Sequence, residues 1–218
     1  MTAIKLSDSE ETMSRWIEPV TLTGNHVRLR PVALDDVDAM ARAAGDGELW
    51  KLWYTTVASP NDMRANTEAA LARRESNGDM PFVVEDAAGE IVGSTRYINV
   101  DPVNQRLEIG NTWYAKRAQR SPVNTECKFL LLGHAFETLG AIAVEFRTHW
   151  HNRASQDAIA RLGAKRDGVL RNHMKGPDGA HRDTVVFSII ESEWPVVRRS
   201  LQHRLTQPRQ VPLAPLAV

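Results

Sequence analysis

The run RLEIGNTWYAKRAQRSPVNTECKFLLLGHAFETLG, residues 106–140, places a strand, a loop and a long helix in immediate succession. In its first part Leu107, Ile109 and Trp113 alternate with Glu108 and other residues. A period of two predicts a strand, here over Arg106–Tyr114.

The last part of this run predicts the strongest helix of the chain, Thr125–Leu139. Its apolar residues recur every three or four positions and form a wide stripe. Asn124 can cap the helix, Glu126 stands in its first turn, and Gly140 can end it in the left-handed conformation.

On both sides of this central run, segments with the strand period of two alternate with segments whose apolar residues recur every three or four positions, as in a helix. The other strands expected are 26–30, 81–85, 90–100, 144–148, 165–173 and 182–190, and the other helices are 34–44, 61–76, 154–162 and 193–205. This order predicts the α+β class, arranged as an α/β three-layer sandwich with one mixed sheet and helices on both faces.

The composition excludes several classes of protein. Lys plus Arg and Asp plus Glu each total 27, so the formal net charge is zero, which argues against a nucleic-acid partner. The single cysteine, Cys127, excludes an intramolecular disulfide framework and a multi-cysteine zinc site. No run approaches the ~20 apolar residues that span a bilayer, so no membrane partner is expected.

The two ends differ from the centre. Residues 1–18 are charged without apolar periodicity, and residues 206–218 hold three prolines. We therefore expect an N-terminal extension over 1–18, one domain over 19–205 and a flexible proline-rich tail over 206–218. The polar, acidic start is unlike a signal peptide, which favours a cytoplasmic location.

The order of elements resembles the GCN5-related N-acetyltransferase (GNAT) superfamily, and within it the RimJ/RimL-like branch. The resemblance runs from about Leu22 to Leu205. It is carried by residues 22–31, 108–113, 124–132, 135–137, 152–155, 158–164, 168–171 and 182–183.

The resemblance implies the acyl-CoA N-acyltransferase fold, whose sheet is mostly antiparallel. It also implies acetyl-CoA as co-substrate and a small-molecule or peptide amine as acceptor. The identity of the acceptor stays open. Dimers are common in the RimJ/RimL-like branch, so a homodimer is one expected assembly.

In the family, a glycine-rich loop before the main helix binds the pyrophosphate of CoA. Here that loop lacks both usual glycines, and Pro122 has no N–H to donate. Arg117 and Arg120 can supply charge instead. The residues that the resemblance assigns to CoA are Trp113, Tyr114, Gln119, Arg120, Ser121, Val123, Asn124, Thr125, Asn152 and Ser155.

By the same resemblance, Glu108 on the central strand is the expected general base. It would take the amine proton directly or through water. The alternative is a salt-bridged strand carboxylate with no catalytic part, in which case another carboxylate such as Glu145 takes the proton.

Ser155 is the expected acid for the CoA thiolate. Many superfamily members have a tyrosine where this chain has Ile159, and RimL-like enzymes use a serine three residues after the asparagine, here Asn152. The alternative is that Asn152 caps a helix and Ser155 fills its third position.

The acceptor is expected near Trp53, Tyr54 and Arg96, since the corresponding regions line that site in relatives. Core packing is the alternative for these aromatic residues. His149 and His151 would point to one side of a strand, but a third ligand of suitable spacing is missing, so no metal is expected. Cys127 falls near a helix start, where the dipole can lower a thiol pKa, yet a buried inert thiol is commoner.

Two functions remain open from the sequence. The first is an acetyl-CoA-dependent N-acetyltransferase in which the amine attacks the thioester directly. The second is a non-catalytic acyl-CoA-binding or regulatory module on the same fold, because a fold does not determine a function.

Overall fold

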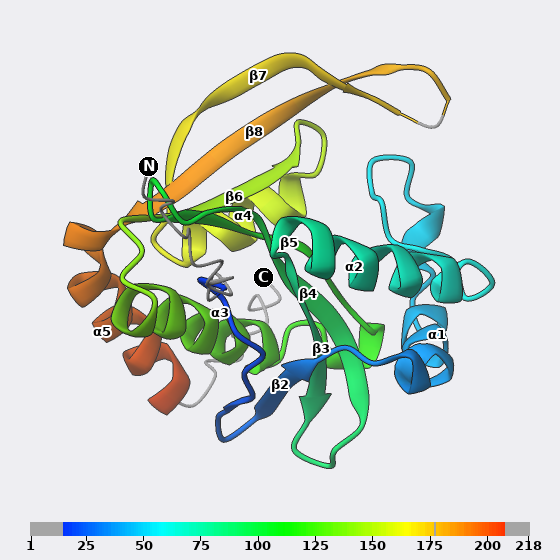
Figure 1. The fold of residues 1–218 in the computed structure, drawn as a ribbon, viewed down its shortest axis with the longest axis horizontal. Coiled ribbons are helices and arrows are strands. Elements are labelled where there is room, and N and C mark those ends of the chain that lie inside the picture. Colours follow the sequence, from blue (N-terminus) through cyan, green and yellow to red (C-terminus); the bar gives the residue numbers. More distant parts are fainter. Residues whose placement is uncertain (1–14, 177, 208–218) are drawn as a thin grey trace, which may run out of the picture.

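An eight-stranded sheet forms the centre of the molecule (Figure 1). The computed structural model describes residues 15–176 and 178–207. The strands lie in the order β1-β2-β3-β4-β5-β6-β8-β7. Their bounds are β1 Leu22–Thr23, β2 Val27–Pro31, β3 Met80–Asp86, β4 Ile91–Asp101, β5 Arg106–Tyr114, β6 Ala143–His149, β7 Lys165–Lys175 and β8 His181–Ile190.

Helices cover both faces of this sheet. Helices α1 (Val37–Gly45) and α2 (Met63–Asn77) pack over a smaller core that includes Val83 and Trp113. Helices α3 (Val123–Gly133), α4 (Arg153–Arg161) and α5 (Trp194–Thr206) contribute to the larger core of the other face. Only β5 and β6 pair in parallel among the described strands. The expected three-layer fold with a mixed, mostly antiparallel sheet is confirmed.

Strands β7 and β8 extend beyond the body of the sheet as a long two-stranded arm (Figure 1). The sequence predicted both strands. None of the helices in the described part of the chain is long and apolar enough to cross a lipid bilayer.

The main helix differs from the prediction at both ends. It starts at Val123, with Pro122 rather than Asn124 at the cap position, and no side chain caps it. The prediction of an Asn124 cap was therefore wrong. Proline fits a helix start because its fixed φ is already helical and its missing N–H would have no partner there. After Gly133 the chain continues as a wider π-helical turn over His134–Thr138.

The sequence-defined ends lie partly outside the described residues, namely 1–14 of the extension and 208–218 of the tail. Within the described part, Ile17 is buried in the larger core. The indole Nε1 of Trp16 donates a hydrogen bond of 3.0 Å to the carbonyl oxygen of Leu139. Residues 16 and 17 thus pack onto the domain.

A buried carboxylate joins the main helix to the edge of the sheet. Glu126, in the first turn of α3, accepts backbone N–H groups from Asn25 (2.9 Å), His26 (2.5 Å) and Val27 (2.8 Å). Gly24 packs so closely against it that an added Cβ would lie 2.4 Å from the carboxyl carbon. This contact holds the β1–β2 turn against the start of α3.

We expect Glu126→Ala to lower the free energy of unfolding by about 1–3 kcal/mol, the cost of one buried donor left without its acceptor. That donor is the Val27 N–H, whereas the N–H groups of Asn25 and His26 are only part-buried and water can reach them. Glu126→Gln keeps one acceptor oxygen and should lose less. Urea denaturation measures both, with the exposed Glu68→Ala as control, and an alanine variant as stable as Glu68→Ala would contradict this assignment.

Candidate active site

Strands β5 and β6 pair over only three residues and then separate. The paired positions are Arg106–Ala143, Leu107–Val144 and Glu108–Glu145. Beyond Glu108, the backbone of β5 has no β6 partner as far as Tyr114. The edge of β5 toward β6 is therefore open over Asn111–Tyr114.

A bulge in β5 lies within this opening. Opposite β4, the register shifts between Ser94 and Arg96, and Asn111 has a φ of 50°. Asparagine adopts this left-handed conformation more readily than most residues. The bulge turns the backbone of β5 locally, next to the segment that β6 leaves unpaired.

Glu108 lies at the point where the two strands separate. Its side chain is buried, and Oε2 accepts a hydrogen bond of 2.7 Å from Nδ2 of Asn99. Gly110 leaves room for it, since a Cβ there would lie 3.0 Å from Oε1. Burial raises the pKa of Glu108, while the nearby Arg147 and the Asn99 hydrogen bond oppose the rise.

Arg147 connects this carboxylate to its neighbour on β6. Its Nε lies 3.4 Å from Oε2 of Glu108, and its Nη2 donates to Glu145 at 2.9 Å. Arg106 also forms an ion pair with Glu145. Glu145, the alternative base, is therefore held by two guanidiniums, whereas Glu108 keeps Oε1 outside these pairs.

The start of α3 presents backbone donors without a side-chain cap. The first N–H groups of a helix have no partner within it, which leaves those of Asn124 and Thr125 as donors for another group. Ser121 Oγ bonds the Ala118 carbonyl at 2.6 Å and accepts a weak bond from the Val123 N–H. Positive φ occurs at Arg120 (55°), where no glycine stands.

The other loop residues predicted to bind CoA have mixed placements. Gln119 Nε2 donates to the carbonyl oxygen of Tyr114 at 3.0 Å, which fixes the loop to the end of β5. Arg120 is exposed and makes no ion pair within the described residues. Arg117 bonds Asp46 through its backbone N–H and lies 3.7 Å from it through Nη1, so its charge is already paired.

Trp113 and Tyr114 are both buried, on opposite faces of the sheet. Only their backbone can contribute to a binding site. The phenol of Tyr114 contacts Cys127, and burial raises the pKa of both groups. Cys127 is thus an inert core thiol, and the helix dipole does not prevail over burial.

Asn152 caps α4, as one alternative predicted. Its Oδ1 accepts the N–H of Ser155 at 3.1 Å. The Ser155 hydroxyl is half-buried and has no hydrogen-bond partner among the described residues. Helix capping therefore leaves that hydroxyl free for another group.

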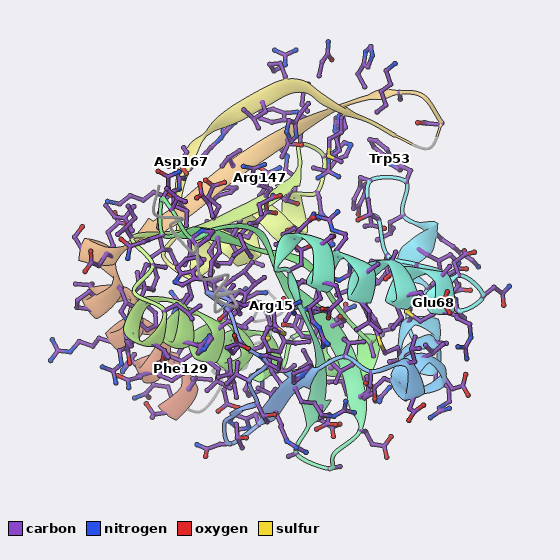
Figure 2. All side chains as sticks on the ribbon, viewed as in Figure 1. Arg15, Trp53, Glu68, Phe129, Arg147 and Asp167 are labelled. Atoms are coloured by element: carbon purple, nitrogen blue, oxygen red, sulfur yellow. The ribbon has the colours of Figure 1, made fainter. Side chains whose placement is uncertain are left out.

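Aromatic and histidine rings meet beyond the end of β6. Trp53 lies on the loop between α1 and α2 (Figure 2) and is 68% exposed. Its ring centroid nevertheless lies 5.1 Å from that of His149 and 5.3 Å from that of His151. Tyr54 lies 6.4 Å from His149. Core packing is therefore the wrong interpretation for Trp53.

The rings of His149 and His151 lie close together, with 5.6 Å between their centroids. His149 Nδ1 accepts the N–H of His151 at 3.0 Å, so one ring nitrogen is already used. Within residues 15–176 and 178–207, no three His, Cys, Asp or Glu side chains are grouped so as to hold a metal.

Arg96 lies on β4, opposite Gly110 of β5. Paired residues of antiparallel strands share a face, so Arg96 lies on the same face as Glu108. Its Nη2 donates to Asn66 of α2 at 2.7 Å, and burial lowers its pKa.

Comparison with known proteins agrees with this geometry. The family model of the acetyltransferase (GNAT) domain matches residues 26–165. The chain belongs to the GNAT acetyltransferase family. The protein is accordingly an N-acetyltransferase, and enzymes of this family use acetyl-CoA.

Solved structures from the same family cover most of the chain. A protein of T. thermophilus assigned as an acetyltransferase is 39% identical, with a TM-score of 0.77 over 87% of this chain and 99% of that chain. A GCN5-related N-acetyltransferase from Brucella melitensis is 30% identical, with a TM-score of 0.76 over 87% of each chain. No curated protein matches the sequence.

A RimJ protein is also among the structural relatives. Mycobacterium smegmatis RimJ, solved with CoA-disulfide, has a TM-score of 0.72 over 85% of this chain and 95% of that chain. At 22% identity, this likeness concerns the fold. In this GNAT protein, the uncapped start of α3 and the unpaired charge of Arg120 suit the diphosphate of CoA.

Sequence reasoning missed a buried lysine beneath the bulge. Lys128 of α3 is fully enclosed, and its Nζ donates to Oγ1 of Thr112 (2.6 Å) and of Thr95 (3.1 Å). The two threonine hydroxyls lie 2.8 Å apart. Burial lowers the pKa of Lys128 to about 8. The sequence gives no signal for this contact, because Lys128 lies on a helix and its two threonine partners lie on different strands.

Asn99, Arg147 and Arg182 also escaped the sequence analysis as site residues. Arg147 alternates in phase with Glu145 along β6, which is a usable signal for a shared face. Asn99 depends on its positive φ of 49°, which only the folded hairpin shows.

We expect Lys128→Met to stabilise the protein at pH 7 by about 2 kcal/mol. The ammonium, with an ordinary pKa of 10.5, is charged in both states at pH 7, and its burial opposes folding. Between about pH 8 and 10.5 the unfolded chain holds more protons than the folded one, so wild-type stability rises with pH through this window.

The advantage of Lys128→Met should therefore shrink from pH 8 to pH 10 in urea denaturation. The exposed Lys175→Met serves as control. A difference that stays constant with pH would contradict a charged, buried Lys128.

Proposed function

We propose that this enzyme transfers the acetyl group of acetyl-CoA to a primary amine, which attacks the thioester directly. The new C–N bond forms as the C–S bond breaks, and CoA leaves as a thiolate that is then protonated. The observation that carries this proposal is the separation of β5 and β6 directly beyond Glu108. It sets a buried carboxylate beside a stretch of β5 whose edge toward β6 has no strand partner.

The proposed base is Glu108. An ammonium must lose its proton before it can attack, and a base works best when its pKa approaches the working pH. Burial raises the pKa of Glu108 in that direction. Glu145 is less suited, because Arg106 and Arg147 both pair with it.

The backbone of β5 is proposed to supply the hydrogen-bond donors for the thioester carbonyl. The edge of Asn111–Tyr114 that faces β6 has no strand partner. N–H groups on that edge can polarise the thioester carbonyl, as preorganised donors do for a developing oxyanion. The buried contact of Lys128 with Thr112 supports the bulge from beneath.

The proposed group at the sulfur is the Ser155 hydroxyl. Asn152 fixes the first turn of α4, and with it the position of Ser155. A serine is a weak acid, so it would hydrogen-bond the thiolate while water delivers the proton.

The acceptor is a small-molecule amine or a peptide N-terminus. Structural relatives include a Vibrio cholerae protein described as a ribosomal-protein-serine acetyltransferase and a Vibrio fischeri ribosomal-protein-S5-alanine acetyltransferase. We further propose residues 19–205 as the catalytic domain, a cytoplasmic location and a homodimer. A thiol-release assay with acetyl-CoA and a panel of amines tests the activity itself.

We expect Glu108→Gln to lower kcat by ~10²–10⁴-fold at neutral pH, the usual contribution of general-base catalysis. The deficit should shrink as pH rises, because more acceptor then arrives without its proton. Glu145→Gln is the matched control and should lose much less. A Glu108→Gln deficit that is constant across the alkaline range would assign Glu108 to positioning.

We expect Ser155→Ala to lower kcat by about 10- to 100-fold, the worth of one hydrogen bond to a charged group. The affinity for CoA, measured by calorimetry, should change little. Thermal melting checks that α4 is intact, since the capping Asn152 is retained. A variant with wild-type turnover would leave Ser155 with no part in catalysis.

A further inference from the structure

The face of the sheet that carries Glu108 holds an excess of positive charge. Glu108, Glu145, Arg147 and His149 share this face, because paired strand positions point the same way. Arg182 of β8 joins them, two residues before Thr184, which pairs with His149. The described residues of β5, β6 and β8 thus place two carboxylates on this face, those of Glu108 and Glu145. They also place three guanidiniums there, those of Arg106, Arg147 and Arg182.

Two of these guanidiniums are neutralised and one is not. Arg106 and Arg147 pair with the carboxylates. Arg182 forms no ion pair within the described residues, and its Nε is buried without any hydrogen-bond partner. Buried polar groups nearly always have a partner, so this donor indicates a group that binds there.

Arg182 is nevertheless close to the proposed base. Its charge lowers the pKa of Glu108 and also that of His149. The neighbouring Asp183 does not neutralise it, because that carboxylate pairs with Arg171 at 2.6 Å and accepts the N–H of Asn172 at 2.8 Å.

Arg96 has a similar free Nε but a different explanation. The buried Asp79 lies near it, at the start of β3, and also has an oxygen without a partner. The other oxygen of Asp79 pairs with Arg73 at 2.8 Å, and Arg96 itself already donates from Nη2 to Asn66. Arg182 has no such side-chain partner among the described residues, so it is the stronger candidate.

We propose that Arg182 binds an anionic oxygen group, a carboxylate or a phosphate, carried by the acceptor near its amine. This inference rests on the proposed function and names its substrate class. The amine lies at Glu108 and the anionic group at Arg182.

Charge balance favours such a substrate over a neutral amine. The face carries one guanidinium more than carboxylates, and an amine that arrives as an ammonium adds a second positive charge. Transfer of its proton to Glu108 leaves this total unchanged. An anion at Arg182 compensates that excess inside a partly buried site, where unpaired charge is costly. Trp53 and Tyr54 lie beside His149 and can pack against the rest of the acceptor.

The test compares acceptors that differ only in the anion. The pairs are glycine and glycinamide, an Asp-Gly amide and an Asn-Gly amide, and phosphoethanolamine and ethanolamine. They distinguish a carboxylate next to the amine, a side-chain carboxylate and a phosphate. We expect at least one anionic member to exceed its partner by 10-fold or more in kcat/KM, since charge-assisted hydrogen bonds contribute ~1.5–3 kcal/mol.

Arg182→Gln should remove this preference by raising KM for the anionic acceptor at least tenfold. It should leave the neutral partner within about twofold, and Arg182→Lys should recover part of the loss. The matched control is Arg171→Gln, which removes an arginine of the same arm that already has a carboxylate partner, and it should keep the preference. Equal losses for both members of a pair, or neutral acceptors preferred throughout, would overturn the anion site.

Calorimetry of the same acceptors with CoA-saturated protein separates the two proposals. Binding that requires the anion and Arg182, without turnover, would overturn the proposed function and keep the anion site. Turnover without any preference for the anion would overturn the anion site and keep the proposed function. The acetyl-CoA-dependent rise in melting temperature checks that each variant is folded.

Discussion

The parallel pairing of β5 with β6 ends after three residue pairs, and the candidate site depends on where it ends. A longer pairing would satisfy the backbone of Asn111–Tyr114 within the sheet and leave no room for a substrate. A shorter one would expose Glu108 to water and remove the burial that raises its pKa. The bulge at Asn111 and the anchoring of β6 by β8 keep the two strands apart beyond this point.

Three charged side chains that lie wholly or partly inside the protein, Glu126, Lys128 and Arg182, differ in how well they are paired. Glu126 accepts three backbone N–H groups and serves the fold. Lys128 has only two hydroxyls, at the bulge, and Arg182 has no partner among the described residues. Burying a charge is costly unless it is paired. The poorly paired cations therefore cost stability close to the proposed site, where well-paired ions would be expected if the fold were the only constraint.

The sequence predicted the element order well where one periodicity dominates. Strand β5 was placed at Arg106–Tyr114, as observed, and the helices were placed to within a few residues. The main helix was misplaced at its start because Asn124 and Pro122 are both acceptable near a helix terminus, and local preference does not rank them. The predicted site residues Glu108, Asn152 and Ser155 came from a resemblance, and the substitutions proposed above test their roles.

The sequence by itself determined the fold class, which follows from local periodicity, and the family, which follows from the resemblance of its short motifs and their order. The residues at the centre of the site are what that resemblance implies. The tertiary structure decided which charges are paired. Glu108 meets Asn99 across a hairpin and Arg147 across a parallel crossover, whereas Arg182 comes within reach through the arm of β7 and β8. Such partners are distant in sequence, and electrostatic interactions depend on separation in space and on burial, which only the folded chain defines.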